Sequence, residues 1–351
     1  MNRTILIIFA VLLLTSCRKD FDFEKAKTNI VLKGKGKEFA QAFEDLFGTP
    51  SNKCTWTMVK QASATLRLDG NEGNCDIKVM TADPRINSEK CFLLATYKNV
   101  STSQPLEFDY PVGLNSVFVS ATAKDGTYTG MADVEDLANQ KEIVLKKDDT
   151  FTMSEVKKMH YTLLFEAFTG GTLDFDYNDV VLDLEYARGE ESMNVTLRAV
   201  GNSYNTRIAY QREKQDEDIF TEAHKALGYP VMYNYATEEN IFYILNTGVN
   251  NSGRKATATV TLGSDKDKSI CEVAGNIIAY IMENDKKEDV VVKYALSSTP
   301  GQPNPEALLL SIPDWNYSRE EMPIHVMYYD FLYWIKDPES NPYWSGYYWA
   351  I

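Results

Sequence analysis

The sequence predicts a mainly β protein, organised as two β-sandwich-like domains with few short helices. From Thr55 onward, short runs rich in β-branched and aromatic residues recur about every ten residues, and polar turn residues separate them. The run VVLDLEY at residues 180–186 alternates most clearly. Its side chains at 180, 182 and 184 share one face of the predicted strand, whereas Val181 lies on the opposite face with Asp183 and Glu185.

The N-terminal segment has the layout of a secretory signal. Arg3 precedes an apolar run from Ile5 to Leu14, which is too short for a comfortable membrane span. The run ends in Leu-Thr-Ser-Cys, which resembles a bacterial lipobox, so we interpret residues 1–17 as a lipoprotein signal with lipidation at Cys17. The alternative is an ordinary signal peptide with an incidental cysteine. The lipobox predicts a bacterial outer-membrane protein, held by its acyl chains at the periplasmic face or the cell surface, with residues 18–35 as a polar tether.

The charge balance excludes one class of partner. The 351 residues include 36 basic and 50 acidic side chains, which give a formal net charge of −14. Binding to nucleic acid or to anionic lipid needs basic patches, so we expect neither as a partner. The length favours more than one domain, and a hydrophobic content of 44% is sufficient for substantial cores.

The first β-domain is predicted over residues 36–150. It begins with a helix near residues 37–47, which Gly48 and Pro50 end. Strand candidates follow at 62–68, 76–82, 91–100, 106–113, 116–123 and 142–147.

Four cysteines follow Cys17, and an even number in an exported protein is compatible with disulfides. They are Cys54, Cys75, Cys91 and Cys271. A hairpin of residues 76–82 and 91–98 places Cys75 and Cys91 at opposite ends, too far apart to bridge. The pairing of the four stays open at this point.

The second β-domain is predicted over residues 155–351. Its strand candidates lie at 161–168, 180–186, 193–201, 240–247, 255–263, 276–283 and 290–297. Near the C-terminus, Ser318 and Glu321 have the spacing of a capping box, and apolar residues recur at helical spacing from Ile324 to Ile335. We therefore expect a single helix there.

An acidic loop lies between the first two strands of this domain. Residues 165–185 hold six carboxylates and no Lys or Arg, and Asp174, Asp176 and Asn178 fall at alternate positions. Hard cations such as Ca²⁺ take six to eight oxygen ligands, which a D-x-D-x-N turn supplies within a few residues. We predict a structural Ca²⁺ held by Glu166, Asp174, Asp176, Asn178 and Asp179. The alternative is an ordinary turn in which Asp and Asn side chains cap backbone amides.

A second candidate site is aromatic. The C-terminal tail contains Tyr343, Trp344, Tyr347, Tyr348 and Trp349. Exposed Tyr and Trp rings stack on sugars and on protein partners, whereas buried rings contribute to a core. The tail either packs on its own domain or presents a contact surface.

Three separate blocks carry a resemblance to a known family. LLFEAF…LDFDYNDVVLDLEY resembles the opening of the LruC domain, which belongs to uncharacterised bacterial envelope proteins. LSIPDWNYSREEMPIHVMYYDFLYWIKDP…YW resembles the closing segment of that domain, and FAQAFEDLFGTPSNKCTWTMVKQASATLRL is similar to the leader before it. The resemblance implies a β-rich, calcium-type domain on an exported protein, with no assigned catalytic activity. Ala167 departs from the family, which has an acidic residue there, and residues 200–290 match only loosely.

Catalytic motifs are missing from the sequence. His160, His224 and His325 are widely separated, and neither a nucleophile elbow, a P-loop, a zinc-protease motif nor a dinucleotide fingerprint occurs. Six clustered carboxylates fit a cation better than a glycosidase, which uses two. We predict a non-enzymatic, lipid-anchored envelope protein that acts in adhesion or interaction at the cell exterior, with an envelope protein or a glycan as its partner. The alternative is a glycan-binding lipoprotein of a polysaccharide-uptake system that uses the aromatic tail.

Overall fold

The computed structural model describes residues 35–70, 73–138, 142–153, 155–167, 174–202, 205–228, 254–285, 288–297, 306–312, 315–318, 322–347 and 349. Within these ranges the protein is mainly β and sandwich-like, which confirms the predicted fold class. Cys17, the strand candidate at 240–247, Glu321 and Tyr348 lie outside the described residues. None of the helices described combines the length and the apolar character that spanning a bilayer requires.

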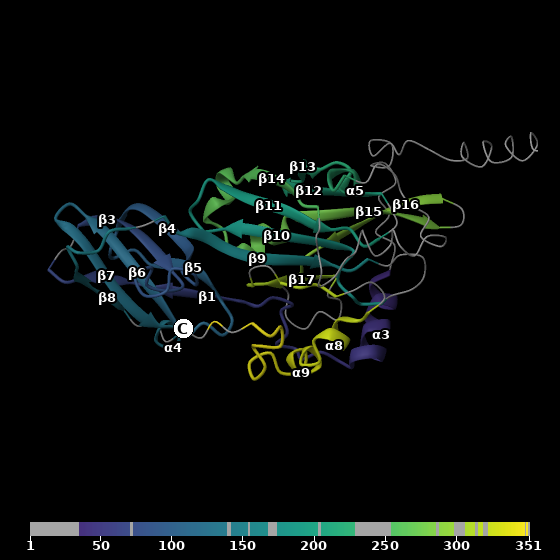
Figure 1. Cartoon of the computed structure of the whole chain (residues 1–351), viewed down its shortest axis with the longest axis horizontal. Helices are drawn as coiled ribbons and strands as arrows, with labels where there is room; N and C mark the ends of the chain where they lie inside the picture. The colour runs from purple at the N-terminus through teal and green to yellow at the C-terminus, as the bar shows by residue number, and fades with distance from the viewer. Residues whose placement is uncertain are drawn as a thin grey trace, which may run out of the picture.

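The first half is a sandwich of two sheets (Figure 1). One layer has the strand order β4-β3-β6-β7-β8-β2, and β1 pairs with β5 in the other layer. The bounds are β1 Val59–Ala64, β2 Leu66–Leu68, β3 Asn74–Met80, β4 Phe92–Ser101, β5 Leu106–Pro111, β6 Ser116–Ala123, β7 Gly126–Asp133, α4 Val134–Ala138 and β8 Ile143–Lys147. Ile77 and Val119 of the first layer share a core with Phe108 of the second.

Strand β7 was not expected from the sequence. Two glycines interrupt it, and glycine is depleted in strands. The structure explains Gly130, because a Cβ there would lie 2.8 Å from the backbone oxygen of Val144 on β8. The close approach of the two strands therefore requires a residue without a side chain.

The second half repeats the two-layer arrangement. One layer has the order β14-β11-β10-β9, with β17 on the other edge of β9, and the facing layer has the order β13-β12-β15-β16. The bounds are β9 Lys157–Phe165, β10 Val180–Tyr186, β11 Ser192–Ala199, β12 Thr206–Arg212, β13 Gln215–Phe220, α5 Ala223–Ala226, β14 Ala256–Thr261, the 3₁₀ helix η4 Gly263–Asp267, α7 Ile270–Gly275, β15 Ile277–Asp285, β16 Glu288–Ala295 and β17 Ala307–Leu310. Leu163 and Leu182 meet Ile208 and Ile277 in the core between the layers.

The hairpin of β12 and β13 was also not predicted from the sequence. Its two turn residues, Glu213 and Lys214, have φ angles of 50° and 66°. Hairpin turns of this kind usually carry Asn or Gly, which adopt positive φ at low cost. The usual sequence signal was therefore missing.

The two halves contact each other beyond the linker that joins them. Phe92 and Leu93 of β4 pair in parallel with Lys157 and Lys158 of β9, so one eleven-stranded sheet runs through both halves. The backbone N–H of Ile270 donates to Asp109 Oδ2 of β5 at 2.8 Å. The division into domains 36–150 and 155–351 stays a prediction.

The N-terminal helix α3 (Lys35–Phe47), assigned from sequence to the first domain, packs against the second half. The ring centroids of Phe43 and Phe175 lie 5.5 Å apart, and those of Phe47 and Phe331 lie 5.6 Å apart. Two short helices, α8 (Ile324–Met327) and α9 (Phe331–Trp334), replace the single C-terminal helix that we expected. Tyr328 leaves the helical conformation between them, with φ −126° and ψ 73°, and its ring stacks on Trp315 at 4.8 Å.

The four cysteines that the structure describes are free thiols. In the β3–β4 hairpin, Cys75 pairs with Val100 and Met80 with Leu93. Cys75 and Cys91 therefore lie at opposite ends of this hairpin, as the sequence predicted.

Candidate metal centre

The acidic loop connects two neighbouring strands at one end of the second half. Glu166 follows directly after β9, and Asp179 directly precedes β10. Phe165 and Val180 are register partners, so Glu166 and Asp179 begin and end the loop at the same end of the paired strands β9 and β10. The backbone N–H of Ala167 donates to Asp179 Oδ2 at 2.6 Å, which closes the base of the loop.

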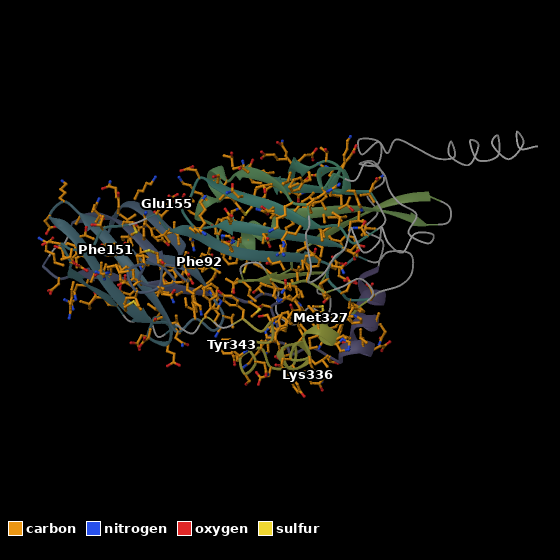
Figure 2. The ribbon with its side chains drawn as sticks, viewed as in Figure 1. Phe92, Phe151, Glu155, Met327, Lys336 and Tyr343 are labelled. Atoms are coloured by element: carbon orange, nitrogen blue, oxygen red, sulfur yellow. The ribbon has the colours of Figure 1, made fainter. Side chains whose placement is uncertain are left out.

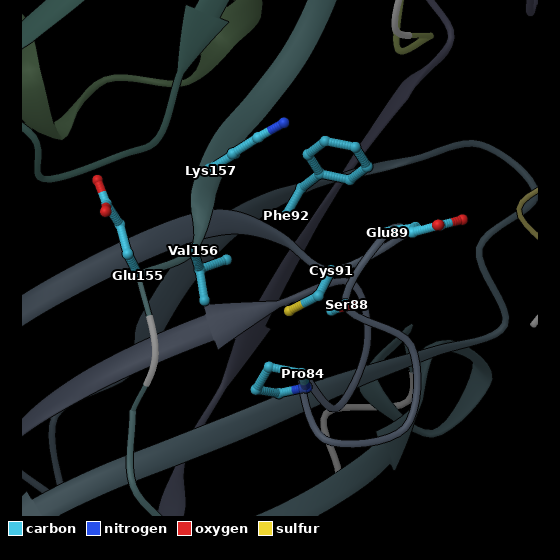
Figure 3. Close-up of a pocket in the computed structure, with 8 residues that line it drawn as sticks. All are labelled: Pro84, Ser88, Glu89, Cys91, Phe92, Glu155, Val156 and Lys157. Atoms are coloured by element: carbon cyan, nitrogen blue, oxygen red, sulfur yellow. The ribbon is translucent and has the colours of Figure 1, made fainter.

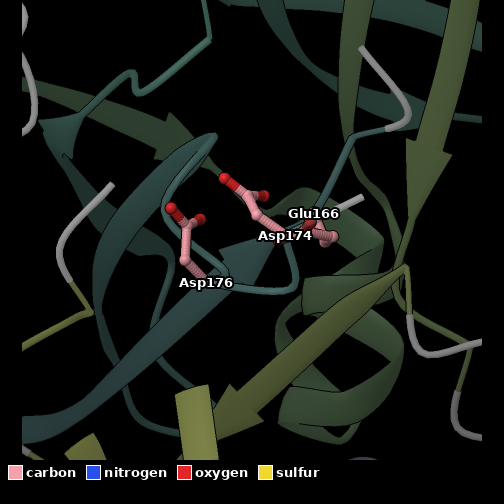
Figure 4. A group of neighbouring side chains, drawn as sticks. All are labelled: Glu166, Asp174 and Asp176. Atoms are coloured by element: carbon pink, nitrogen blue, oxygen red, sulfur yellow. The ribbon is translucent and has the colours of Figure 1, made fainter. Parts of the chain in front are cut away.

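Three carboxylates converge in this loop. Glu166, Asp174 and Asp176 each present an oxygen within 4.8 Å of the others (Figure 4). Calcium binds oxygens at 2.3–2.6 Å, so ligands on opposite sides of one ion lie about 5 Å apart. The three oxygens are therefore close enough together to contact one cation.

Glu166 orders the loop by accepting hydrogen bonds from its backbone. Its two oxygens accept the N–H groups of Phe175 and Tyr177, both at 2.8 Å. Phe175 and Tyr177 have φ angles of 53° and 56°. A left-handed conformation costs a bulky residue about 1–2 kcal/mol, so the loop adopts it only because other contacts compensate. The N–H groups of Phe175 and Tyr177 thus turn toward one carboxylate, as in the anion-binding backbone arrangement called a nest.

The same two residues connect the loop to the core. The side chains of Phe175 and Tyr177 are buried in a cluster with Phe43, Trp334 and Val181. The loop therefore has an aromatic side that packs on α3 and α9, and a carboxylate side formed by alternate residues.

Burial strongly disfavours the charged forms of two carboxyls. Glu166 is 0% exposed, and burial together with the negative charges of Asp179 and Asp174 raises its pKa well above the usual range. Burial also raises the pKa of Asp179 to about 8, although the N–H of Ala167 partly opposes this shift. The loop must therefore take up protons or bind a cation near neutral pH.

Two buried oxygens beside the loop have no hydrogen-bond partner within the described part of the chain. They are Asn178 Oδ1 and Ser318 Oγ, on residues that are 1% and 0% exposed. The amide nitrogen Asn178 Nδ2 donates to the backbone oxygen of Ser318 at 3.2 Å, so the two residues are in direct contact. Buried polar atoms are nearly always satisfied, and an ion or its water would provide the missing partner.

The structure places the five predicted ligands unequally. Glu166, Asp174 and Asp176 form the close trio, whereas Asp179 receives the N–H of Ala167, and Asn178 contacts the C-terminal segment. Asp183 and Glu185 lie along β10, as predicted. Asp183 there forms an ion pair with the buried Arg198 at 3.2 Å.

Sequence reasoning missed the residues that support the loop from a distance. Asn202 donates to the backbone oxygen of Asp179 at 2.9 Å, and His224 Nε2 lies 2.8 Å from the backbone oxygen of Asn202. Ser318 comes from a segment 140 residues after Asn178. The sequence signal at Ser318 predicted a helix cap and not a contact with the loop, because only the fold brings these three residues there.

The aromatic tail packs mostly inside. Trp344 and Trp349 are 3% and 2% exposed, and Tyr347 is half-buried against the core. The Tyr343 hydroxyl donates to the backbone oxygen of Gly113 at 3.2 Å. The described rings of the tail therefore do not form an exposed platform.

Two hollows of the described surface lack a catalytic constellation. A cavity of about 150 Å³ lies where residues 84–92 meet 155–157 (Figure 3). Its thiol, Cys91, donates to the backbone oxygen of Ala82 at 3.1 Å, and burial raises the thiol pKa to about 11, so the reactive thiolate is scarce. A wider groove of about 850 Å³ near Arg67 and Glu142 is lined by hydroxyl-bearing and aliphatic residues. The three histidines lie on β9, α5 and α8.

No family model matches the chain, and no curated protein matches it.

Proposed function

We propose that this protein is a non-enzymatic, lipid-anchored protein of the bacterial envelope, acting in adhesion or interaction at the cell exterior, and that a structural Ca²⁺ stabilises its second half. The single observation that carries the calcium part is the trio Glu166, Asp174 and Asp176, whose oxygens lie within 4.8 Å of one another around a fully buried glutamate. The lipid anchor at Cys17 and the resemblance to the LruC domain remain predictions from sequence.

The electrostatics support a cation over a bare turn. Like charges buried together either repel one another or become protonated, and a divalent cation removes both costs. Asn178 Oδ1 would complete the set as a neutral ligand, since it has no other partner among the described residues. Water and backbone oxygens would fill the remaining positions, as is usual for Ca²⁺.

The role of the ion would be to stabilise the packing of α3 and the C-terminal segment against the loop. The backbone N–H of Ile324 donates to Phe175 O at 2.9 Å, and Asn178 Nδ2 donates to Ser318 O. Phe175 also contacts Phe43 of α3. An ion that orders the loop therefore also orders the surface on which α3, α8 and the segment near Ser318 pack.

The burial of Trp344 and Trp349 bears on the alternative function. A glycan-binding tail needs several rings that face solvent on one platform. Packed rings fit an interaction protein with an internally docked tail, so the described rings of the tail do not support the glycan alternative.

Thermal unfolding of Asp176→Asn tests the calcium site. This change keeps the acceptor that receives the Asn178 N–H at 3.2 Å but removes one charge. In chelator we expect an unchanged or higher Tm, because repulsion is relieved. In millimolar calcium we expect a lower Tm than for the native chain, since each tenfold loss of affinity removes about 1.4 kcal/mol of stabilisation.

Asp183→Asn is the matched control. It makes the same chemical change on β10 but breaks the ion pair with Arg198, so it should lower Tm equally in chelator and in calcium. Mg²⁺ should replace Ca²⁺ poorly, because it requires octahedral geometry and keeps its waters. If calcium leaves the Tm of the native chain unchanged, the loop is an ordinary turn and the proposal is wrong.

A further inference from the structure

Exposed apolar side chains are concentrated on helices α3, α8 and α9. Among the described residues, four of the seven exposed large hydrophobic side chains lie on α3, α8 and α9 or between them: Leu46, Val326, Tyr329 and Tyr333. We call these four side chains the helical face. The other three, Ile86, Met131 and Val144, belong to the β3–β4 connection and to strands β7 and β8.

The three helices form one packed unit along one side of the second half (Figures 1 and 2). Phe47 of α3 lies 5.2 Å from the ring of His325 on α8 and 5.6 Å from that of Phe331 on α9. The rings of Tyr329 and Tyr333 meet edge to face at 5.7 Å. The helical face therefore sits on a well-packed base.

This unit is also the part of the described fold that follows the predicted anchor. Helix α3 begins at Lys35, and the 17 residues 18–34 separate it from Cys17. A fully extended residue spans about 3.6 Å, so acyl chains on Cys17 keep α3 within about 60 Å of the membrane. A surface connected in this way meets lipid at a high effective concentration.

We propose that, in the anchored protein, the helical face lies on the zwitterionic lipid surface of the membrane, with Tyr329 and Tyr333 among the headgroups. This inference rests on the proposed lipid anchor. Tyrosine has an apolar ring and a polar tip, which suits the boundary between headgroups and acyl chains. Exposed Lys336, Asp330 and Asp45 bring both signs of charge to these helices, so the contact is apolar and does not depend on anionic lipid.

A fluorophore on Val326→Cys tests this contact. The chain of residues 18–351 is held by an N-terminal hexahistidine on phosphatidylcholine vesicles that contain a nickel-chelating lipid and a nitroxide-labelled lipid as quencher. Ile86→Cys, at a position 80% exposed in the first half, is the matched control label. The native cysteines in the described ranges are buried or half-buried, which favours labelling at the introduced thiol.

We expect the nitroxide lipid to quench the label at 326 and to leave the label at 86 unaffected. Replacing both tyrosines, Tyr329→Ser with Tyr333→Ser, should lower the equilibrium constant for contact by about tenfold, because two rings lose their apolar burial in lipid. If the face is instead a contact surface for a protein or a glycan, it does not lie on these vesicles. The label at 326 then stays as unquenched as the label at 86, and the proposal is wrong. Quenching that persists in the double variant also overturns it. Because the hexahistidine replaces the acyl chains, these outcomes do not depend on whether Cys17 is lipidated.

Discussion

Calcium should stabilise the protein more strongly as the pH rises, because the cation and protons compete for the same buried carboxyls. In the cation-free protein, burial raises the pKa of Asp179 from 3.8 to about 8, and that of Glu166 also lies well above its usual range. An unfolded carboxyl ionises near pH 4. Between about pH 4 and 8 the folded state therefore binds more protons than the unfolded state. The stabilisation that these two carboxyls contribute is full below about pH 4 and is lost as the pH rises through their folded pKa.

The size of this loss follows from the shift at Asp179. A rise from 3.8 to about 8 corresponds to roughly 6 kcal/mol, at about 1.4 kcal/mol per pH unit. A bound Ca²⁺ favours the ionised form of Glu166 and of Asp179, whose charge interacts with that of Glu166. The loss should then disappear when calcium is present.

The assay is urea unfolding from pH 5 to 8.5, in excess chelator and in millimolar calcium. The difference between the two free energies of unfolding isolates the effect of calcium, because every titrating group that does not interact with the ion contributes equally to both. We expect this difference to grow by about 1.4 kcal/mol per pH unit up to about pH 8 if one proton is displaced. Asp179→Asn keeps an acceptor for the Ala167 N–H and should flatten the slope. A difference that is independent of pH, or larger in acid, would refute the reasoning.

Three further predictions concern other parts of the chain. Phe43→Ala should lower the free energy of unfolding by about 3–5 kcal/mol, because it leaves a cavity under α3. The control Leu46→Ala, at a position 43% exposed, should change it by less than about 0.5 kcal/mol. If urea unfolding gives similar values for the two variants, the packing of α3 is wrong. Burial lowers the pKa of His224 from 6.5 to about 4, so the native protein should lose about 3 kcal/mol as the pH falls from 6.5 to 4, and His224→Gln should abolish this acid loss. An acid loss of equal size in His224→Gln would assign the effect elsewhere. Cys17→Ala should abolish acylation and detergent-phase recovery, and a variant still acylated and processed at the same place would rule out the lipobox.

The strand pattern and the proximity of the three carboxylates could be predicted locally. Alternation identified β10, and Leu182 and Leu184 are buried as the period of two requires. Glu166, Asp174 and Asp176 lie within ten residues of one another, so a single turn suffices to bring their oxygens together. Carboxylates at that density also have few explanations other than a cation or a proton.

Tertiary packing decided what covers the loop and the strand. The alternation placed Val181 on the polar face of β10 with Asp183, yet Val181 is buried because helices from both ends of the chain cover that end of the strand. The same cluster buries Trp344, which sequence alone left between a core position and an exposed contact. Local periodicity reports only which side chains share a face of their own element. Whether that face meets water or another element depends on contacts between residues such as Phe43 and Phe175, which are far apart in the chain.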